Sequence, residues 1–88
     1  MITMQPLVID TRSSEPSYVQ LARQLRDAVT SGEIEPGGEL PSQNRIRQET
    51  GLAPGTIQRA IGVLVDEGIA YTVPGRGTFA GSRPEQPE

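Results

Sequence analysis

Three polar residues that can contact nucleic-acid bases stand close together in the sequence, at Thr56, Gln58 and Arg59. A glutamine can form two hydrogen bonds with adenine, a threonine can contact a thymine methyl group or a phosphate, and an arginine can bind guanine or a phosphate. Such side chains at the N-terminal end of a helix are typical of a protein that enters the major groove of DNA. These three residues are therefore the first candidates for base contacts.

Another candidate, Arg76, lies between Gly75 and Gly77. The glycines let the backbone approach a phosphate closely, and a guanidinium group can enter a narrow minor groove. The alternative is that the glycines serve only a turn and that Arg76 is a solvated surface charge. We favour the DNA contact.

Ser42 and Arg45 are candidates of a different kind. Ser42 is predicted to cap the N-terminus of a helix, and a phosphate contact there is a lesser role that is compatible with the cap. Arg45 takes the third position of that helix, where a glutamate would suit both the capping box and the helix dipole. This misfit indicates either that Arg45 is placed for a partner or that it is an idle surface arginine.

Apolar residues at intervals of three and four predict the helices that position these candidates. The first helix is predicted over residues 17–31, followed by Gly32 as a C-cap. The second is predicted over residues 43–50. The third begins at Pro54, because a proline fits the first turn of a helix, and ends at Gly68.

Alternating apolar residues then predict two short strands over 69–73 and 78–80, joined by a turn. Three helices, the second and third joined by a tight turn that contains Gly51, followed by a hairpin, are the order of a winged helix-turn-helix. The predicted fold is thus mainly α with a small β-hairpin, a three-helix bundle plus a wing.

At 88 residues the chain is expected to form one domain. We expect a flexible N-terminal arm over residues 1–15, a winged helix-turn-helix DNA-binding domain over 16–80 and a disordered acidic tail over 81–88.

The composition argues against catalysis and metal binding. The chain has no cysteine, so it can form neither a disulfide nor a thiolate metal site, and it has no histidine, the commonest metal ligand and general base. No phosphate-binding glycine-rich loop lies beside a predicted strand, and no paired carboxylates are expected to converge in a cleft. We therefore expect neither enzyme activity nor a cofactor.

The sequence also lacks the features of membrane and secreted proteins. No apolar run approaches the roughly 18 residues that a membrane span needs. The N-terminus has no basic region followed by an apolar one, as a secretory signal would. A cytoplasmic location without membrane contact is the resulting expectation.

The net charge of −3 opposes binding to DNA, because cations supply much of that affinity. Residues 41–64 nevertheless carry Arg45, Arg47 and Arg59 against Glu49 alone, so their local charge is three minus one, or +2. All eight cations are arginine, which suits bidentate contacts to phosphate or guanine but can equally reflect a codon bias. A winged helix that contacts another protein, with little affinity for DNA, is the alternative function.

The run from Ser17 to Ala80 resembles the DNA-binding domain of GntR-type regulators of bacterial transcription. The motifs that carry the resemblance are, in chain order, Tyr18 with Gln20-Leu21, Gly32, Pro36-Gly37, Leu40-Pro41-Ser42, Gly51, Thr56 to Ala60, Glu67-Gly68 and Gly75-Arg76-Gly77-Thr78-Phe79. The stretch from Pro54 to Ala60 and Tyr71 are similar to the YtrA-like branch, whose members have short C-terminal parts.

The resemblance implies a sequence-specific regulator, expected to act as a repressor, with its third helix in the major groove of a double-stranded operator and its wing in the minor groove. The family usually has an arginine where this chain has Asn44, so one phosphate contact is expected to be weakened, and Arg45 or Arg47 could substitute for it. Ala53 stands where a serine or asparagine cap is common.

The resemblance also implies a homodimer on two half-sites, usually formed by a region after the wing. The chain is therefore expected to be either a piece of a longer regulator or a minimal protein. A minimal protein would dimerise through its arm or its first helix, or not at all.

Overall fold

The computed structural model describes residues 7–82. Three helices are followed by a two-stranded antiparallel hairpin, and their bounds are α1 (Ser17–Thr30), α2 (Gln43–Thr50), α3 (Pro54–Asp66), β1 (Ala70–Val73) and β2 (Gly77–Ala80). The predicted fold class and order of elements are confirmed, and the predicted element ends agree to within two residues. Residues 1–6 of the predicted arm and 83–88 of the predicted tail lie outside the described residues.

The core lies where one face of α3 packs against α1 and α2. The largest fully buried side chains come from all three helices, and they are Leu21, Leu25, Ile46, Ile57 and Leu64. Their spacing is that of the apolar stripe of an amphipathic helix, which explains why the helical pattern of the sequence predicted the core. Within residues 7–82, no helix has the length and apolar content needed to cross a bilayer.

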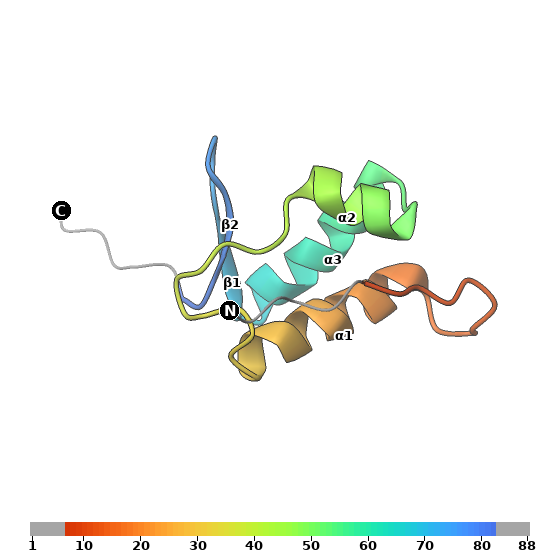
Figure 1. Cartoon of the computed structure of the whole chain (residues 1–88), viewed down its shortest axis with the longest axis horizontal. Coiled ribbons are helices and arrows are strands. Elements are labelled where there is room, and N and C mark those ends of the chain that lie inside the picture. Colours follow the sequence, from red (N-terminus) through yellow and green to blue (C-terminus); the bar gives the residue numbers. More distant parts are fainter. Residues whose placement is uncertain (1–6, 83–88) are drawn as a thin grey trace, which may run out of the picture.

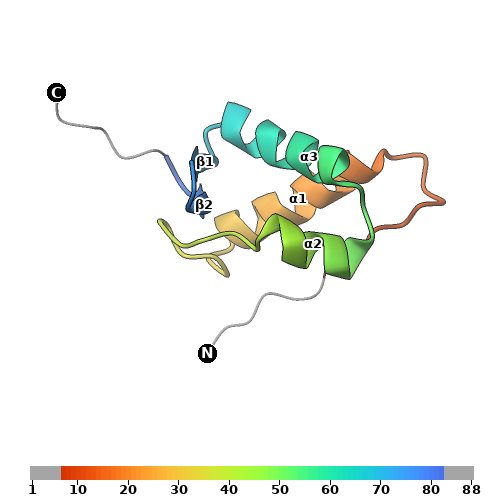
Figure 2. The same cartoon turned by 90° about the horizontal axis from the view of Figure 1, so that it is seen from above.

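The elements that carry the candidate residues lie on one side of the molecule. In Figure 1, α2, the N-terminal end of α3 and the tip of the hairpin are at the top, while α1 runs along the bottom. Figure 2, seen from above, shows α2 and α3 next to one another and the hairpin beyond the C-terminal end of α3. The fold therefore offers the second and third helices and the wing to a partner from the same direction.

The hairpin has a third, short partner in the segment that leads to α2. Three backbone hydrogen bonds of 2.8 Å join that segment to β2, from Gly37 to Ala80, from Ala80 to Gly38 and from Leu40 to Thr78, donor first. Leu40 is also buried in the core. This pairing was not predicted, because a pairing between segments so far apart in the sequence leaves no local signal.

The described part of the N-terminal segment, from Leu7 onward, runs along α1 (Figure 1). Leu7 is only 4% exposed and belongs to the hydrophobic core. Its backbone N–H donates to Glu49 Oε1 of α2 at 3.2 Å. Hydrophobic burial and a hydrogen bond thus hold the start of the described chain between two helices.

Two glutamines of α1 bind the backbone of this segment as a pair. Gln24 bonds both the N–H and the C=O of Val8, at 3.0 and 2.6 Å, and Gln20 does the same for Asp10, at 2.8 and 2.9 Å. Residues two apart in an extended chain are separated by about 6.8 Å. Residues four apart in a helix rise by about 6 Å, so the two spacings match.

The hydrogen bonds of Gln20 to the N-terminal segment can be tested by mutation. Gln20 is 4% exposed and also donates to the backbone C=O of Glu15 at 2.8 Å. We expect Gln20→Ala to lower the free energy of unfolding by about 1–3 kcal/mol, since it leaves part-buried backbone groups of Asp10 and Glu15 without these partners. Urea unfolding followed by circular dichroism measures the change. The control is Gln48→Ala, at an exposed position of α2, which is expected to stay within about 0.5 kcal/mol of the parent. Equal stabilities of the two variants would contradict the prediction.

Candidate nucleic-acid interface

Local backbone signals fix the turn between α2 and α3. The Ser42 hydroxyl accepts a hydrogen bond from the N–H of Arg45 at 3.1 Å, so the predicted cap of α2 is confirmed. Gly51 ends α2 in the left-handed conformation, with φ of 74°, which glycine adopts without steric cost. Pro54 lies in the first turn of α3, where its missing N–H is not needed. The two helices therefore form a tight helix-turn-helix.

The buried face of α3 decides which of its side chains remain accessible. Ile57 and Ala60 are fully buried. Gln58 and Arg59, which lie between them in the sequence, are exposed, and Thr56 is half-buried. The three predicted base-contacting residues thus lie at the N-terminal end of α3, and two of them are open to a partner.

Arg59 has a contact that the sequence did not predict. Its guanidinium carbon lies over the ring of Tyr18, 4.2 Å from the ring centroid. Tyr18 stands at the N-terminal end of α1 and is half-buried against the core. A cation over an aromatic face is attracted by the ring quadrupole, so this contact joins α1 to the exposed side of α3.

On α2, the predicted phosphate-contacting residues are bonded within the helix. Arg45 Nε donates to Glu49 Oε2 at 2.9 Å, and Arg47 Nη2 donates to Asn44 Oδ1 at 2.7 Å. All four side chains are on exposed residues. Asn44, where the resemblance suggests an arginine, therefore orients Arg47, while Glu49 competes for the charge of Arg45.

The hairpin turn places Arg76 at an exposed tip. The N–H of Arg76 donates to the C=O of Val73 at 2.9 Å across Pro74 and Gly75, and Gly75 has φ of 77°. Proline followed by a residue of positive φ is the pattern of a type II turn. The predicted turn is confirmed, and it leaves the guanidinium group of Arg76 free of ion pairs among residues 7–82.

Gly77 is required by its backbone conformation, and the end of a flexible side chain lies close to it. Its φ is 128°, a conformation that other residues rarely adopt. A Cβ atom at this position would lie 2.8 Å from Glu39 Oε2. The carboxylate of Glu39 therefore lies against the tip end of β2, next to Arg76 in the sequence.

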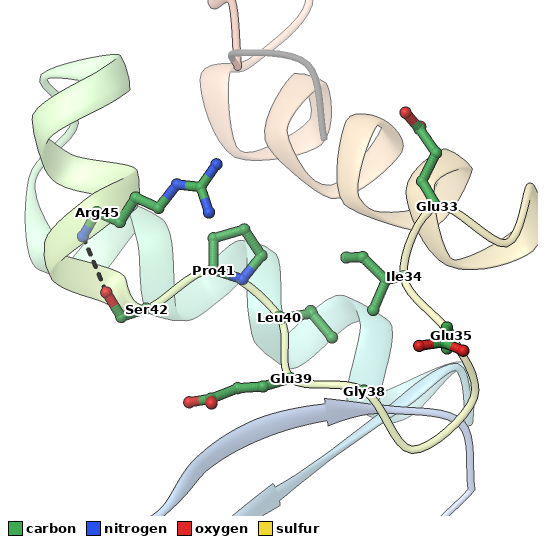
Figure 3. A pocket seen from close by; sticks show the side chains of 9 residues that line it. All are labelled: Glu33, Ile34, Glu35, Gly38, Glu39, Leu40, Pro41, Ser42 and Arg45. Atoms are coloured by element: carbon green, nitrogen blue, oxygen red, sulfur yellow. Dashed lines mark hydrogen bonds between the residues drawn. The ribbon is translucent and has the colours of Figure 1, made fainter. Parts of the chain in front are cut away.

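A hollow of about 500 Å³ opens between the segment that precedes α2, residues 33–41, and the start of α2 (Figure 3). Its charged lining residues are Glu33, Glu35, Glu39 and Arg45. Figure 3 shows Glu39 pointing away from Glu33 and Glu35, so the carboxylates do not converge. The excess of negative charge makes this hollow an unfavourable place for a phosphate. In residues 7–82 no group of carboxylates could hold a metal ion.

The distribution of ion pairs separates the arginines into two groups. Within the described part of the chain the ion pairs are Arg23 with Glu15, Arg26 with Glu67 and Arg45 with Glu49. Arg12, Arg47, Arg59 and Arg76 belong to none of them. The exposed end of α3 and the wing thus each present a cation that no carboxylate neutralises.

Sequence reasoning missed Tyr18 and Glu49 as parts of this surface. Tyr18 fits the apolar stripe of α1, which predicted a core role only. Glu49 accepts from Arg45 one helical turn earlier, a spacing that could have revealed the pair. Its second partner, Leu7, lies far away in the sequence and gave no signal.

Comparisons with known proteins agree with this architecture. Residues 17–80 match the family described as bacterial regulatory proteins, gntR family. The chain is 36% identical over 77 residues to the HTH-type transcriptional repressor NagR of Bacillus subtilis, covering 88% of this chain and 31% of that protein. It is 38% identical over 71 residues to the repressor YtrA of the same organism, covering 81% and 55%.

A solved structure is similar as well. The AraR DNA-binding domain in complex with operator ORX1 has a TM-score of 0.78 and 33% identity, covering 84% of this chain and 94% of that one. The fold is therefore that of a winged helix-turn-helix. The chain spans between about a third and just over half of the lengths of the two repressors.

Glu49 predicts how stability depends on pH. Hydrogen bonds from Arg45 and from the Leu7 N–H hold the pKa of its carboxyl below the ordinary value of 4.5. A lowered pKa in the folded state stabilises the fold above that ordinary value, and the gain is lost as the pH falls through the folded pKa. Glu49→Gln should therefore reduce the loss of stability on acidification.

Urea unfolding between pH 7 and pH 3 measures this difference. The matched control is Glu33→Gln, because Glu33 is exposed and takes part in none of the ion pairs of residues 7–82. The prediction fails if the stability of the Glu49 variant falls as steeply with acid as that of the control.

Gly77→Ala should destabilise the wing, because alanine would have to adopt an unfavourable φ, while the flexible Glu39 side chain can move aside. We expect a loss of about 1–3 kcal/mol in the free energy of unfolding. Gly62→Ala is the control: it lies inside α3 with nothing within 4 Å of the added Cβ, and it should gain up to about 1 kcal/mol. Thermal unfolding should separate the two variants in opposite directions from the parent, and a shift in the same direction would refute the argument.

Proposed function

Because the chain belongs to the GntR family of bacterial regulatory proteins, we propose that it is a sequence-specific DNA-binding regulator of transcription that acts as a repressor. The observation that carries the proposal is the placement of the exposed N-terminal end of α3 and the tip of the hairpin on the same side of the fold (Figure 1). Each bears an arginine outside every ion pair of residues 7–82. In this proposal α3 enters the major groove of an operator and the wing enters the minor groove.

The relatives support this proposal in two ways. NagR and YtrA are named as transcriptional repressors, and the AraR domain of the same fold was solved with operator DNA. Enzymatic chemistry is no part of the proposed function. The regulator would act in the cytoplasm, where bacterial DNA lies.

The side chains of α3 would supply the sequence preference. Gln58 is exposed and can form two hydrogen bonds with adenine. Thr56 is half-buried, so its methyl or hydroxyl group is suited to a short contact near the helix end. One good bidentate contact discriminates between bases by roughly 1–3 kcal/mol.

The start of α2 and the wing would supply contacts with the DNA backbone. The exposed residues Ser42 and Asn44 lie at the N-terminal end of α2, where the helix dipole favours anions. Arg47, which is bonded to Asn44, lies in the last turn of α2. Arg45 would have to exchange Glu49 for a phosphate. At the wing, Gly75 and Gly77 give Arg76 its exposed turn.

The net charge of −3 is compatible with this function because of where the charges lie. Glu33, Glu35 and Glu39 line the hollow beside the wing (Figure 3). Glu15 and Glu67 are paired with arginines of α1. Arg59 thus forms no ion pair with any of these carboxylates, whereas Arg76 has Glu39 close by, against the neighbouring Gly77.

In this proposal residues 16–80 bind DNA, and the regulator acts as a homodimer. Two copies on two half-sites would follow the symmetry usual for helix-turn-helix proteins. The chain covers 31% and 55% of its two repressor relatives.

The test is selection of bound sequences from a random duplex pool, followed by titration of the selected duplex at several salt concentrations. The logarithm of the affinity should fall linearly with the logarithm of salt concentration, because phosphate contacts release counterions. Half-sites spaced by about one helical turn would identify a dimer. A flat salt dependence with no binding even at low salt would instead favour a winged helix that contacts another protein.

Variants of Gln58 and Arg76 should separate base contacts from charge. Gln58→Ala should lower affinity for the selected duplex by about 5- to 150-fold and relax the preference at one base pair. Arg76→Ala should weaken selected and unrelated duplexes alike and reduce the salt slope by about 1. The control is Arg23→Ala, since Arg23 lies on α1 and is paired with Glu15. Equal losses in all three variants would argue against the proposed interface.

A further inference from the structure

Tyr18 and Arg59 form a contact whose chemistry differs from that of the other arginine contacts. The Arg59 guanidinium carbon lies 4.2 Å from the centroid of the Tyr18 ring. Tyr18 packs against the core from α1, while Arg59 is exposed on α3. The ring is therefore a fixed surface, and the guanidinium group lies on its outer face.

An aromatic partner orients a cation without neutralising it. Glu49 both orients Arg45 and cancels its charge, and Glu67 does the same for Arg26. Arg59 belongs to no ion pair among residues 7–82, so it keeps its full positive charge while its position is fixed. A long side chain held in one geometry before binding loses less conformational entropy when it binds.

The contact with the ring also leaves the hydrogen-bonding groups of Arg59 available. A guanidinium group carries five N–H donors, and an aromatic ring face offers them no oxygen or nitrogen acceptor. The structure gives the Arg59 side chain no hydrogen bond to any other of the residues 7–82. The unused donors and the intact charge match a phosphate, whose oxygens accept such bonds.

We propose that Tyr18 is a positioning residue that holds the Arg59 guanidinium as a preoriented cation for a backbone phosphate of DNA. The contact lies where α1 meets α3, at the flank of the helix that would enter the major groove, where a sugar-phosphate strand passes. Arg59 then adds affinity that does not depend on sequence, and Gln58 is left as the exposed base-contacting residue. This inference rests on the proposed function.

The test compares the full chain with four variants: Tyr18→Phe, Tyr18→Leu, Arg59→Ala and the double change Tyr18→Leu with Arg59→Ala. Leucine preserves apolar packing but removes the ring face, and phenylalanine restores the face without the hydroxyl group. Affinities are measured for the selected duplex and for an unrelated duplex over a range of salt concentrations. Thermal unfolding of each protein reports its stability.

Arg59→Ala should weaken both duplexes by the same factor and lower the salt slope by about 1, as loss of one phosphate contact does. Tyr18→Leu should weaken both by about two- to fivefold with the salt slope retained, because the charge remains but its orientation is lost. Tyr18→Phe should recover most of that loss. In the Arg59→Ala background, Tyr18→Leu should have no further effect on binding.

Three results would overturn the proposal. A loss confined to the selected duplex in Arg59→Ala would assign that arginine to a base. An equal effect of Tyr18→Leu with and without Arg59 would assign the tyrosine to folding alone. If the Arg59→Ala variant bound both duplexes as tightly as the parent, Arg59 would make no phosphate contact.

Absence of any binding by the parent at low salt would instead overturn the proposed function, and this inference with it. A second measurement does not require changing Tyr18. The Arg59 Nε–H resonance in nitrogen-15 spectra should be displaced upfield by the ring and should shift further when DNA is added. A resonance at the position of the other arginines would contradict the stacked geometry.

Discussion

The burial of one face of α3 against α1 and α2 is the interaction on which the other features depend. Ile57 and Leu64 of α3 meet a core that includes Leu25 of α1 and Ile46 of α2, all fully buried. Burying each such side chain stabilises the fold by roughly 1.5–3 kcal/mol. Once this face is fixed, the helical period alone sends Gln58 and Arg59 to the outside.

Features with local signals could be predicted from the sequence. The Ser42 cap, the left-handed Gly51 and Pro54 in the first turn of α3 each depend on neighbouring residues, and the structure contains all three. The turn that carries Arg76 was predictable for the same reason. These local elements are enough to give the order of helices and strands and, with it, the fold class.

Features that join distant segments could not be predicted from one sequence. The stacking of Arg59 on Tyr18 and the bond from Leu7 to Glu49 bring together residues about forty positions apart. Apolar periodicity places Tyr18 against the core, which is half of its environment. A periodic pattern does not say what lies over the face of its ring. The candidate site was therefore predicted as a set of residues, while the partners that orient or neutralise them came from the tertiary structure.

The three backbone bonds between β2 and the segment before α2 have a mechanical consequence. Leu40 is bonded to β2, buried in the core and separated from the helix cap Ser42 by Pro41 alone. The hairpin therefore cannot tilt by itself: it would have to break these bonds or pull Leu40 from the core. The distance between the wing and the second helix is fixed in this way, so in the proposed complex the DNA would have to bend or twist to contact both. Base steps that no side chain touches would then influence affinity through their stiffness.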